Sequence, residues 1–236
     1  MPREPSGAAG PGRQGTDRRD PVAGTDGPTS RVERGTPRSG RPPRVGVLGG
    51  TFDPVHVGHL VVAQEARFAL GLDRVLLVVA NDPWQKTAQA PVTPAEDRLA
   101  VVQAAVDGVE GVEACRIEID RGGPSYTVDT LQELQAAEPG AELYLIVGAD
   151  VVPSLPTWHR ADELPALATL VVARRAGTAD VGDPAGWRVV HLPVPRLEVS
   201  SRDLRSRLAA GRPVGFLVPA AAIRCISSRG LYAGSR

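Results

Sequence analysis

The chain has 236 residues, of which 42% are hydrophobic, so it can form one α/β domain with a sizeable core. Its formal net charge is zero, which argues against a dedicated nucleic-acid binder, and its two cysteines are too few for a disulfide framework. The longest aliphatic run, residues 75–80, is far shorter than the roughly 20 residues that span a membrane. We therefore expect a cytoplasmic protein with no nucleic-acid or membrane partner, and we leave open whether it forms a homo-oligomer.

Residues 1–43 differ in composition from the rest of the chain. They contain eight Gly, eight Pro and eight Arg, but beyond Met1 only Val22 and Val32 from the group Val, Ile, Leu, Phe and Met. Such a segment buries too little apolar surface to offset the entropy of ordering, so we predict a disordered extension followed by a single domain over residues 44–236. The alternative is a basic arm for an anionic partner, since eight Arg stand against five acidic residues.

From Arg44 onward, short apolar segments alternate with segments of helical periodicity. Strands are predicted at residues 44–48, 75–79, 112–119, 143–147, 168–173 and 188–192. Helices are predicted at residues 57–70, 94–107 and 125–137, and from about 201 and 219, with Thr93 as the N-cap of the second. Because the strands are apolar throughout, they indicate a parallel sheet covered on both faces. The expected fold class is α/β: a doubly wound, Rossmann-like parallel sheet with helices on both faces and a small C-terminal helical part.

The turn after the first strand carries a candidate nucleotide-binding segment, Gly49-Gly50-Thr51-Phe52. In doubly wound sheets, ligands bind beyond the carboxyl ends of the strands. Gly49 and Gly50 permit unusual backbone angles and close approach of a ligand, and the helix start that follows offers N–H groups and a positive dipole end to a phosphate. The P-loop and dinucleotide-binding patterns are absent at this position. On its own, this turn predicts phosphate binding and nothing more specific.

Two of the four histidines, His56 and His59, follow this turn. Three residues apart, they project from one face of a helical turn, and Gly58 between them leaves room for a bulky anion. Imidazoles in this position can donate hydrogen bonds to phosphate oxygens and carry positive charge as negative charge accumulates on phosphorus. The alternatives are surface or helix-capping histidines, and a zinc site that would lack a third cluster of ligands.

The segment Gly49–His59 resembles the extended HxGH signature, GGTFDPxHxGH, of the nucleotidyltransferase superfamily, and in particular the nicotinate-nucleotide adenylyltransferase family. The resemblance extends from about Val45 to Tyr232. It implies that AMP is transferred from ATP to nicotinate mononucleotide, with His56 and His59 as catalytic residues that bind the ATP phosphates. It also implies that Mg²⁺ is bound through those phosphates rather than by a metal site of the protein.

A second candidate ATP-binding segment, with Ser200, Ser201 and Arg205, lies at the start of a predicted helix whose natural N-cap is Ser201. Hydroxyls, N–H groups and a guanidinium at a helix start can hold a triphosphate; the alternative is an ordinary capped helix with a surface Arg. The segment is similar to the ISSTxxR segment of the family, which implies ATP binding by all three residues and a catalytic role for Arg205. Arg202 stands where the family has Thr.

Gly148 and Asp150 follow the predicted strand 143–147 and complete the expected ATP site. An acidic side chain at the carboxyl edge of a sheet can accept hydrogen bonds from ribose hydroxyls, and it can also cap a helix. The two residues resemble the GxD motif of the family, which implies contact with the ribose of ATP.

The second substrate is expected at the start of the helix that follows Pro124. Ser125, Tyr126 and Thr127 resemble the PSYTxxTL segment of the family, whose backbone N–H groups meet the pyridine carboxylate, and a helix start offers such N–H groups. Trp158 matches the aromatic residue that stacks on the pyridine ring in the family. For a single Trp beside Pro, packing in the core is the alternative interpretation.

Two basic residues are further candidates for binding this substrate. Lys86 is the only lysine of the chain, and its compact charge suits the mononucleotide phosphate, although many family members have a His where this chain has Gln85. Arg174 and Arg175 together resemble a family turn that faces phosphate; plain solvent exposure is the alternative.

The site as a whole lacks a catalytic triad, which suits a reaction in which the phosphate of the substrate is itself the nucleophile. One rival interpretation is another HxGH nucleotidyltransferase, acting on nicotinamide mononucleotide or phosphopantetheine. Another is a nucleotide-sensing protein that binds ATP without turnover. The PSYT-like segment and Trp158 favour a pyridine nucleotide as substrate, and the presence of both His56 and His59 favours catalysis.

Overall fold

The computed structural model describes residues 40–83, 92–175, 177 and 182–234. Residues 1–39, which make up most of the expected disordered extension, and the candidate residue Lys86 lie outside the described residues. The chain divides into two units, Met1–Glu33 and Arg34–Arg236, and everything described below belongs to the second.

Six strands form one sheet: β1 (Arg44–Gly50), β2 (Arg74–Val79), β3 (Val112–Cys115), β4 (Glu142–Gly148), β5 (Thr169–Arg175) and β6 (Val189–Val194). Their order is β3-β2-β1-β4-β5-β6, and every neighbouring pair is parallel. The register places Val47 of β1 opposite Leu76 on one side and Leu145 on the other. These three side chains lie on one face and are at most 2% exposed, and Leu77 and Ile146 on the other face are at most 1% exposed, so the central strands are buried on both faces. The predicted doubly wound parallel sheet is confirmed.

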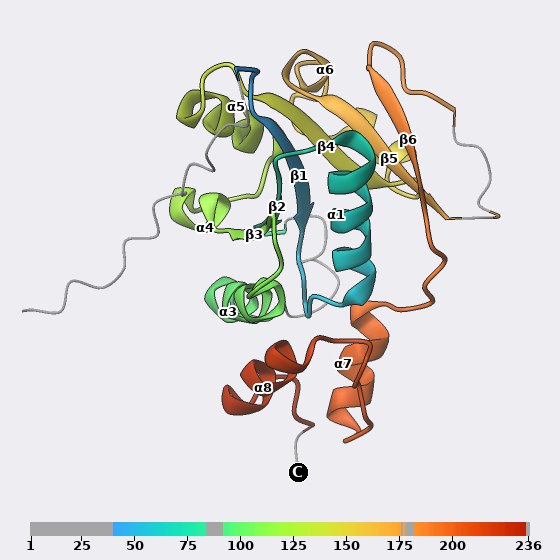
Figure 1. Ribbon diagram of the computed structural model, residues 1–236. Coiled ribbons are helices and arrows are strands. Elements are labelled where there is room, and N and C mark those ends of the chain that lie inside the picture. The colour runs from blue at the N-terminus through green and yellow to red at the C-terminus, as the bar shows by residue number, and fades with distance from the viewer. Residues whose placement is uncertain (1–39, 84–91, 176, 178–181, 235–236) are drawn as a thin grey trace, which may run out of the picture. The chain divides into compact units, whose positions relative to one another are not determined.

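The helices are α1 (Val57–Leu70), α3 (Ala95–Val106), α4 (Ile117–Arg121), α5 (Thr127–Ala137), α6 (Leu164–Leu167), α7 (Ser201–Ala209) and α8 (Ala220–Ser228), with a 3₁₀ helix, η1, at Val152–Thr157. Side chains at alternate strand positions belong to two different apolar layers. Val75 and Leu77 pack with α1, α3, α7 and α8, whereas Leu76 and Val78 pack with α5 and α6. Figure 1 shows α1 lying along the sheet, with α7 and α8 beyond its end. Among the described residues, no helix is both long enough and apolar enough to cross a membrane.

The strand predicted at residues 112–119 is wrong in its second half. β3 ends at Cys115, and Ile117–Arg121 forms the short helix α4. Alternating Ile and polar residues suggested a strand, but Ile117 packs against one apolar layer and Ile119 against the other, which a helical turn between the layers allows. An ion pair from Arg116 Nε to Asp120 Oδ1, at 2.7 Å, spans this turn.

Two predicted N-caps and one predicted helix start are displaced by one or two residues. The N-cap of α3 is Pro94 rather than Thr93, whose carbonyl and N–H instead bind other side chains. The N-cap of α7 is Ser200 rather than Ser201: its Oγ accepts the N–H of Asp203 at 3.2 Å. Likewise, α5 begins at Thr127, two residues after the predicted start. By contrast, α1 spans the predicted residues.

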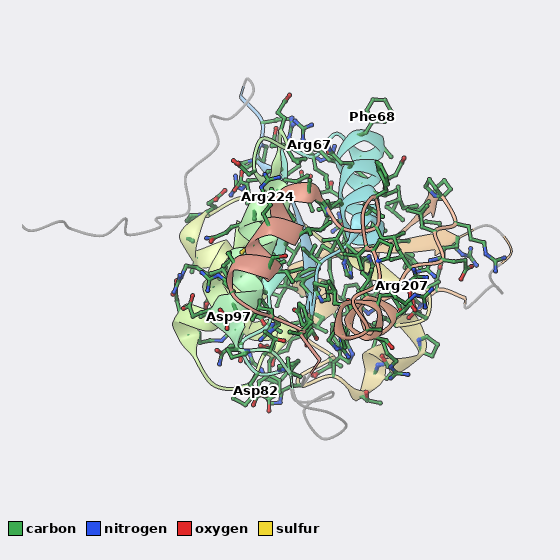
Figure 2. The ribbon with its side chains drawn as sticks, turned by 90° about the horizontal axis from the view of Figure 1, so that it is seen from below. Arg67, Phe68, Asp82, Asp97, Arg207 and Arg224 are labelled. Carbon is green, nitrogen blue, oxygen red and sulfur yellow. The ribbon has the colours of Figure 1, made fainter. Side chains whose placement is uncertain are left out.

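The two C-terminal helices are fastened to the carboxyl end of the sheet. The N–H of Val57, the first residue of α1, donates to the carbonyl of Leu217 at 2.9 Å. Arg229, just after α8, donates through Nη1 to Asp97 Oδ1 of α3 at 2.6 Å, and Figure 2 shows Asp97 close to α8. Ser201 and Arg205 also bind the loop between β1 and α1. The two segments that were predicted to bind ATP therefore meet at the carboxyl end of the sheet, near the switch point between β1 and β4.

Candidate active site

The glycines at the end of β1 serve different purposes. A Cβ at Gly49 would meet nothing within 4 Å, whereas a Cβ at Gly50 would lie 2.9 Å from the ring of Phe52. Neither glycine has positive φ; the residue in the left-handed region is Phe52, with φ of 49°. Our expectation of unusual backbone angles at the glycines is therefore wrong. Gly49 leaves the backbone open to a ligand, and Gly50 makes space for Phe52, whose buried ring meets the imidazole of His59 edge-on at 5.0 Å.

The two histidines of the HxGH motif form a stacked pair at the start of α1. Their ring centroids are 3.7 Å apart, with an angle of 22° between the planes. His56 is the N-cap, and its backbone N–H donates to Nδ1 of His59 at 3.2 Å. Because Nδ1 of His59 accepts this bond, a neutral His59 carries its proton on Nε2. The capping and phosphate-binding interpretations of the histidines are therefore compatible. The hydrogen bond at the helix cap occupies Nδ1 of His59 and leaves Nε2 as its donor.

His56 is 7% exposed, and burial lowers its pKa to about 4, with the charge of Arg175 acting in the same direction. The imidazole of His56 is therefore neutral at neutral pH in this state, and the charge expected on it as negative charge accumulates on phosphorus stays a prediction. Its buried Nδ1 has no hydrogen-bond partner within the described part of the chain. A buried ring nitrogen in this position is energetically costly unless a ligand or a water molecule satisfies it.

Gly58 has a different function from the one expected. A Cβ at this position would lie 3.0 Å from Nδ1 and 3.1 Å from Cε1 of His56, and 3.2 Å from Cγ1 of Val199. The space beside Gly58 is thus filled by the imidazole of His56 and a methyl group, not reserved for an anion. A side chain at this position would press on the first histidine, which folds back over Gly58.

The start of α7 meets the loop between β1 and α1. Ser201 Oγ donates to the carbonyl of Pro54 at 2.8 Å, and Arg205 Nη1 donates to the carbonyl of Asp53 at 2.6 Å. The partners are 147 and 152 positions apart in the chain, so only the fold unites these two segments. Ser200 Oγ accepts a backbone N–H as N-cap, which leaves its proton for another acceptor, and Arg202 is exposed.

Asp53 is a site residue whose role the sequence did not reveal. It is 5% exposed, and its two carboxylate oxygens accept hydrogen bonds from the hydroxyl of Tyr232 at 2.7 Å and from the N–H of Thr93 at 3.3 Å. Burial beside this carboxylate raises the pKa of Tyr232. Asp53 therefore joins the ATP-binding loop to the start of α3 and to the C-terminal tail. The only sequence signal was an acidic residue inside the HxGH segment.

Arg98 was also missed, although it is 1% exposed and lies beneath the site. Its Nε donates to the carbonyl of Thr93 at 2.7 Å, Nη1 to that of Thr51 at 2.8 Å, and Nη2 to that of Asn81 at 3.2 Å. One planar guanidinium thus binds three carbonyls of two loops, the loop after β1 and the connection between β2 and α3. Burial lowers the pKa of Arg98, while the charge of Asp53 opposes this effect. The available signal was a charged residue in the apolar stripe of α3.

Gly148 and Asp150 lie at the end of β4, next to β1. A Cβ at Gly148 would collide with the carboxylate of Asp150, so glycine allows this carboxylate to fold back over the end of the strand. Asp150 is exposed, as a ribose-binding carboxylate would be. The geometry places the two residues at the switch point but leaves their contact with ribose a prediction.

The start of α5 forms the other side of the site. Tyr126 is the N-cap and its side chain makes no capping hydrogen bond, so it leaves the N–H groups of the first turn, from Thr127 onward, to other acceptors. Ser125 is held by the loop after β2: its Oγ accepts the N–H of Asn81 at 2.8 Å, and its own N–H donates to the carbonyl of Asp82 at 3.0 Å. Asp82 is labelled in Figure 2.

The remaining candidates of the substrate site are partly brought together. His159, next to Trp158, stacks on the ring of Tyr126 with centroids 4.2 Å apart, so the region of Trp158 lies beside the start of α5. Trp158 packs partly against the core, and its buried Nε1 has no partner among the described residues. Arg174 lies at the end of β5, but it is the neighbouring Arg175 whose charge acts on His56.

Within residues 40–83, 92–175, 177 and 182–234, no group of three or more His, Cys, Asp or Glu side chains is placed to hold a metal ion. Asp53, the buried carboxylate nearest to the HxGH histidines in sequence, already has partners on both oxygens. The described residues thus offer an ATP-bound cation no cluster of three or more such ligands.

Comparison with known proteins agrees with this geometry. Residues 47–207 match the cytidylyltransferase-like family. A protein of Saccharopolyspora erythraea, described as a probable nicotinate-nucleotide adenylyltransferase, is 44% identical over 81% of this chain and 90% of its own length. A protein of Streptomyces coelicolor with the same description is 46% identical over 79% of this chain and all of its own length.

Solved structures share the fold at much lower identity. The nicotinic acid mononucleotide adenylyltransferase of Plasmodium falciparum, complexed with NaAD, superposes with a TM-score of 0.68 at 16% identity, over 80% of this chain and 97% of its own. Its identity is low enough that it supports the fold alone. The family resemblance stated from the sequence is confirmed by the bacterial relatives. The chain is an enzyme of the nicotinate-nucleotide adenylyltransferase family, within the cytidylyltransferase-like nucleotidyltransferases.

Proposed function

We propose that the protein transfers AMP from ATP to nicotinate mononucleotide, giving nicotinate adenine dinucleotide and pyrophosphate. The observation that carries this proposal is the meeting of two distant segments: α7, with Ser201 and Arg205, binds the Asp53-Pro54 carbonyls of the HxGH loop at the switch point of the sheet. The uncapped start of α5 lies on the same edge of the sheet and supplies a second anion-binding element.

The chemistry requires no nucleophile from the protein. A phosphate oxygen of nicotinate mononucleotide attacks the α-phosphorus of ATP, a new P–O–P bridge forms, and the bond from the α-phosphorus to the oxygen of the β-phosphate breaks to release pyrophosphate. The barrier is bringing two anions together and stabilising charge on the phosphorus and the leaving group. Positioning and preorganised donors then supply most of the rate enhancement.

The donors that we assign to the ATP phosphates come from both segments. His59, whose Nδ1 is occupied by the backbone of His56, would direct Nε2–H to the α-phosphate. His56 would act as a neutral donor, because its pKa lies near 4, and binding an anion would raise that pKa. Ser200 and Arg205 would hold the triphosphate, with Arg205 giving up part of its contact with Asp53.

A divalent cation, for which Mg²⁺ is the expected choice, would reach the site with ATP and neutralise phosphate charge there. The donor set fits such a role, because Mg²⁺ retains waters and binds through phosphates with few protein ligands, and among the described residues no cluster of metal ligands competes with the nucleotide for it. Since ATP is held inside cells, we place the reaction in the cytoplasm.

The pyridine end of the substrate would lie at the start of α5. Its carboxylate would accept the uncapped N–H groups from Thr127 onward, where the helix dipole favours negative charge. The ring would lie near Trp158, which the stack of His159 on Tyr126 holds beside this helix. Lys86 remains the predicted partner of the mononucleotide phosphate.

The test is an assay of pyrophosphate release with purified protein, ATP and Mg²⁺. Nicotinate mononucleotide, nicotinamide mononucleotide and phosphopantetheine are compared at equal concentrations, and the product is identified by mass spectrometry. We expect the highest kcat/KM with nicotinate mononucleotide. Preference for phosphopantetheine, or ATP binding without any turnover, would overturn the proposal.

A further inference from the structure

Glu118 is a buried carboxylate that no step of the proposed reaction uses. It lies on α4, in the part of the chain where the sequence predicted a strand, and it is 7% exposed. Its Oε1 accepts the hydroxyl of Thr130 at 2.6 Å. Burial raises the pKa of Glu118, and the hydroxyl of Ser125 is the second group that stabilises the charged form and so opposes this rise. A buried carboxylate is costly unless hydrogen bonds satisfy it, and here two hydroxyls do so.

Both hydroxyls belong to the substrate side of the site. Thr130 is 1% exposed in the second turn of α5, and Ser125 precedes that helix. The Oγ of Ser125 accepts the N–H of Asn81 at 2.8 Å, so its proton points to Glu118 while its lone pair holds the loop after β2. Arg121 donates to the hydroxyl of Thr130 at 3.2 Å, which completes the hydrogen bonds of that oxygen.

The contacts of Glu118 with Ser125 and Thr130 hold the chain on both sides of the start of α5, and we call this arrangement a clamp. Ser125 lies before the N-cap Tyr126 and Thr130 lies after the first turn, so one carboxylate fixes both ends of the backbone that presents its N–H groups. We propose that Glu118 is a positioning residue for the pyridine nucleotide, holding the start of α5 and the loop after β2 in register through Ser125 and Thr130. This role rests on the proposed function, because it presupposes that the pyridine nucleotide binds at α5.

The contacts also confine the effect to one substrate. The HxGH loop is held by other groups: Arg205 and Tyr232 bind Asp53. Arg98 binds the carbonyl of Thr51 as well as that of Asn81 in the loop after β2. None of the hydrogen bonds of Glu118 reaches the HxGH loop. Loss of the clamp should therefore weaken binding of the pyridine nucleotide and leave the binding of ATP nearly unchanged.

The decisive variant is Glu118→Gln, which keeps the size of the side chain and one acceptor oxygen but removes the charge that draws two hydroxyl protons. The amide keeps an acceptor for the hydroxyl of Thr130, so we expect the variant to fold, which its unfolding midpoint checks. We expect the KM for nicotinate mononucleotide to rise about tenfold, the scale of a misplacement of a fraction of an ångström, with the KM for ATP changed by less than about twofold.

The matched control is Asp120→Asn, on the same helix. Asp120 is exposed and pairs with Arg116 at 2.7 Å, without touching Ser125 or Thr130. Both KM values of this variant should stay within about twofold of wild type. Thr130→Val should reproduce the effect of Glu118→Gln, whereas Thr130→Ser, which keeps the hydroxyl, should restore the wild-type KM. Equal rises in both KM values, or a failure of Thr130→Ser to restore function, would overturn the positioning role.

Amide hydrogen exchange separates this proposal from the proposed function. In Glu118→Gln, peptides covering residues 123–130 should exchange about tenfold faster, while peptides from β1 and β4 stay unchanged. If the wild-type protein does not transfer AMP to nicotinate mononucleotide, the proposed function fails, and exchange still reports whether Glu118 holds this backbone. Wild-type exchange rates at residues 123–130 in Glu118→Gln would overturn the clamp itself.

Discussion

The substitution Gly58→Ala adds one methyl group beside His56, and we expect it to lower turnover while changing stability little. The methyl would lie 3.0 Å from Nδ1 and 3.1 Å from Cε1 of His56, and 3.2 Å from Cγ1 of Val199. Atoms at these separations are closer than the optimum of about 3.5–4.0 Å, so the imidazole must retreat by roughly half an ångström. It cannot do so alone, because His56 is buried and stacked on His59 at 3.7 Å.

The cost to catalysis follows from that displacement. Misplacing a catalytic group by about 1 Å costs about 100-fold in rate, so we expect turnover of Gly58→Ala to fall about 10- to 100-fold, or about 1.4–2.8 kcal/mol. Stability should change little. Ala is favoured over Gly in a helix by about 0.5–1 kcal/mol, which offsets part of the steric cost in α1. The free energy of unfolding should therefore stay within about 1 kcal/mol of wild type.

The assay is steady-state pyrophosphate release for wild type, Gly58→Ala, His56→Ala and the double variant, with urea unfolding of each. If the methyl acts by displacing the imidazole of His56, adding Gly58→Ala to His56→Ala should cost almost nothing further. Two results would refute this reasoning: turnover of Gly58→Ala within twofold of wild type, or a loss of the same size when His56 is absent.

Three other substitutions test the remaining assignments. His59→Ala should lower turnover at least about 100-fold with an unchanged unfolding midpoint, and wild-type turnover would remove His59 from the mechanism. The pKa of His56 is lowered from its ordinary value of 6.5 to about 4, so the unfolded state binds more protons between these values and stability falls as the pH drops through this window. Urea unfolding should show wild type losing up to about 3 kcal/mol more than His56→Asn between pH 7 and pH 4, and parallel pH profiles would contradict the shift. Arg98→Met should leave three loop carbonyls unpaired, lower the free energy of unfolding by about 3 kcal/mol and raise both KM values; a fully stable variant would show that these carbonyls find other partners.

Much of the fold followed from local pattern. Apolar runs such as residues 75–79 are short, free of Pro and Gly, and bounded by helical periodicity, so they predict buried parallel strands without knowledge of their partners. The strand prediction failed at residues 117–121 because it, too, depended on local pattern alone. Alternating Ile and acidic residues fit a strand as well as a short helix, and only the two apolar layers on either side of Ile117 and Ile119 decide between them.

The sequence predicted those parts of the candidate site that consist of contiguous residues, such as the HxGH motif. The spacing of His56 and His59 already implied a shared face on a helical turn, and the structure stacks them. What the spacing did not show is that one imidazole is neutral, because burial depends on everything that packs around it. Nor did it show that the glycine between them makes space for the first ring.

The sequence by itself thus determined the sheet, the two candidate ATP-binding segments and the family, because these depend on periodicity and on short motifs. The tertiary structure alone decided which groups hold the segments together. Arg98, Asp53 and Glu118 look like ordinary charged residues along the chain. Their roles arise from carbonyls, N–H groups and hydroxyls supplied by loops far away in sequence. A buried charge is stable only where such partners converge, and convergence is a property of the fold.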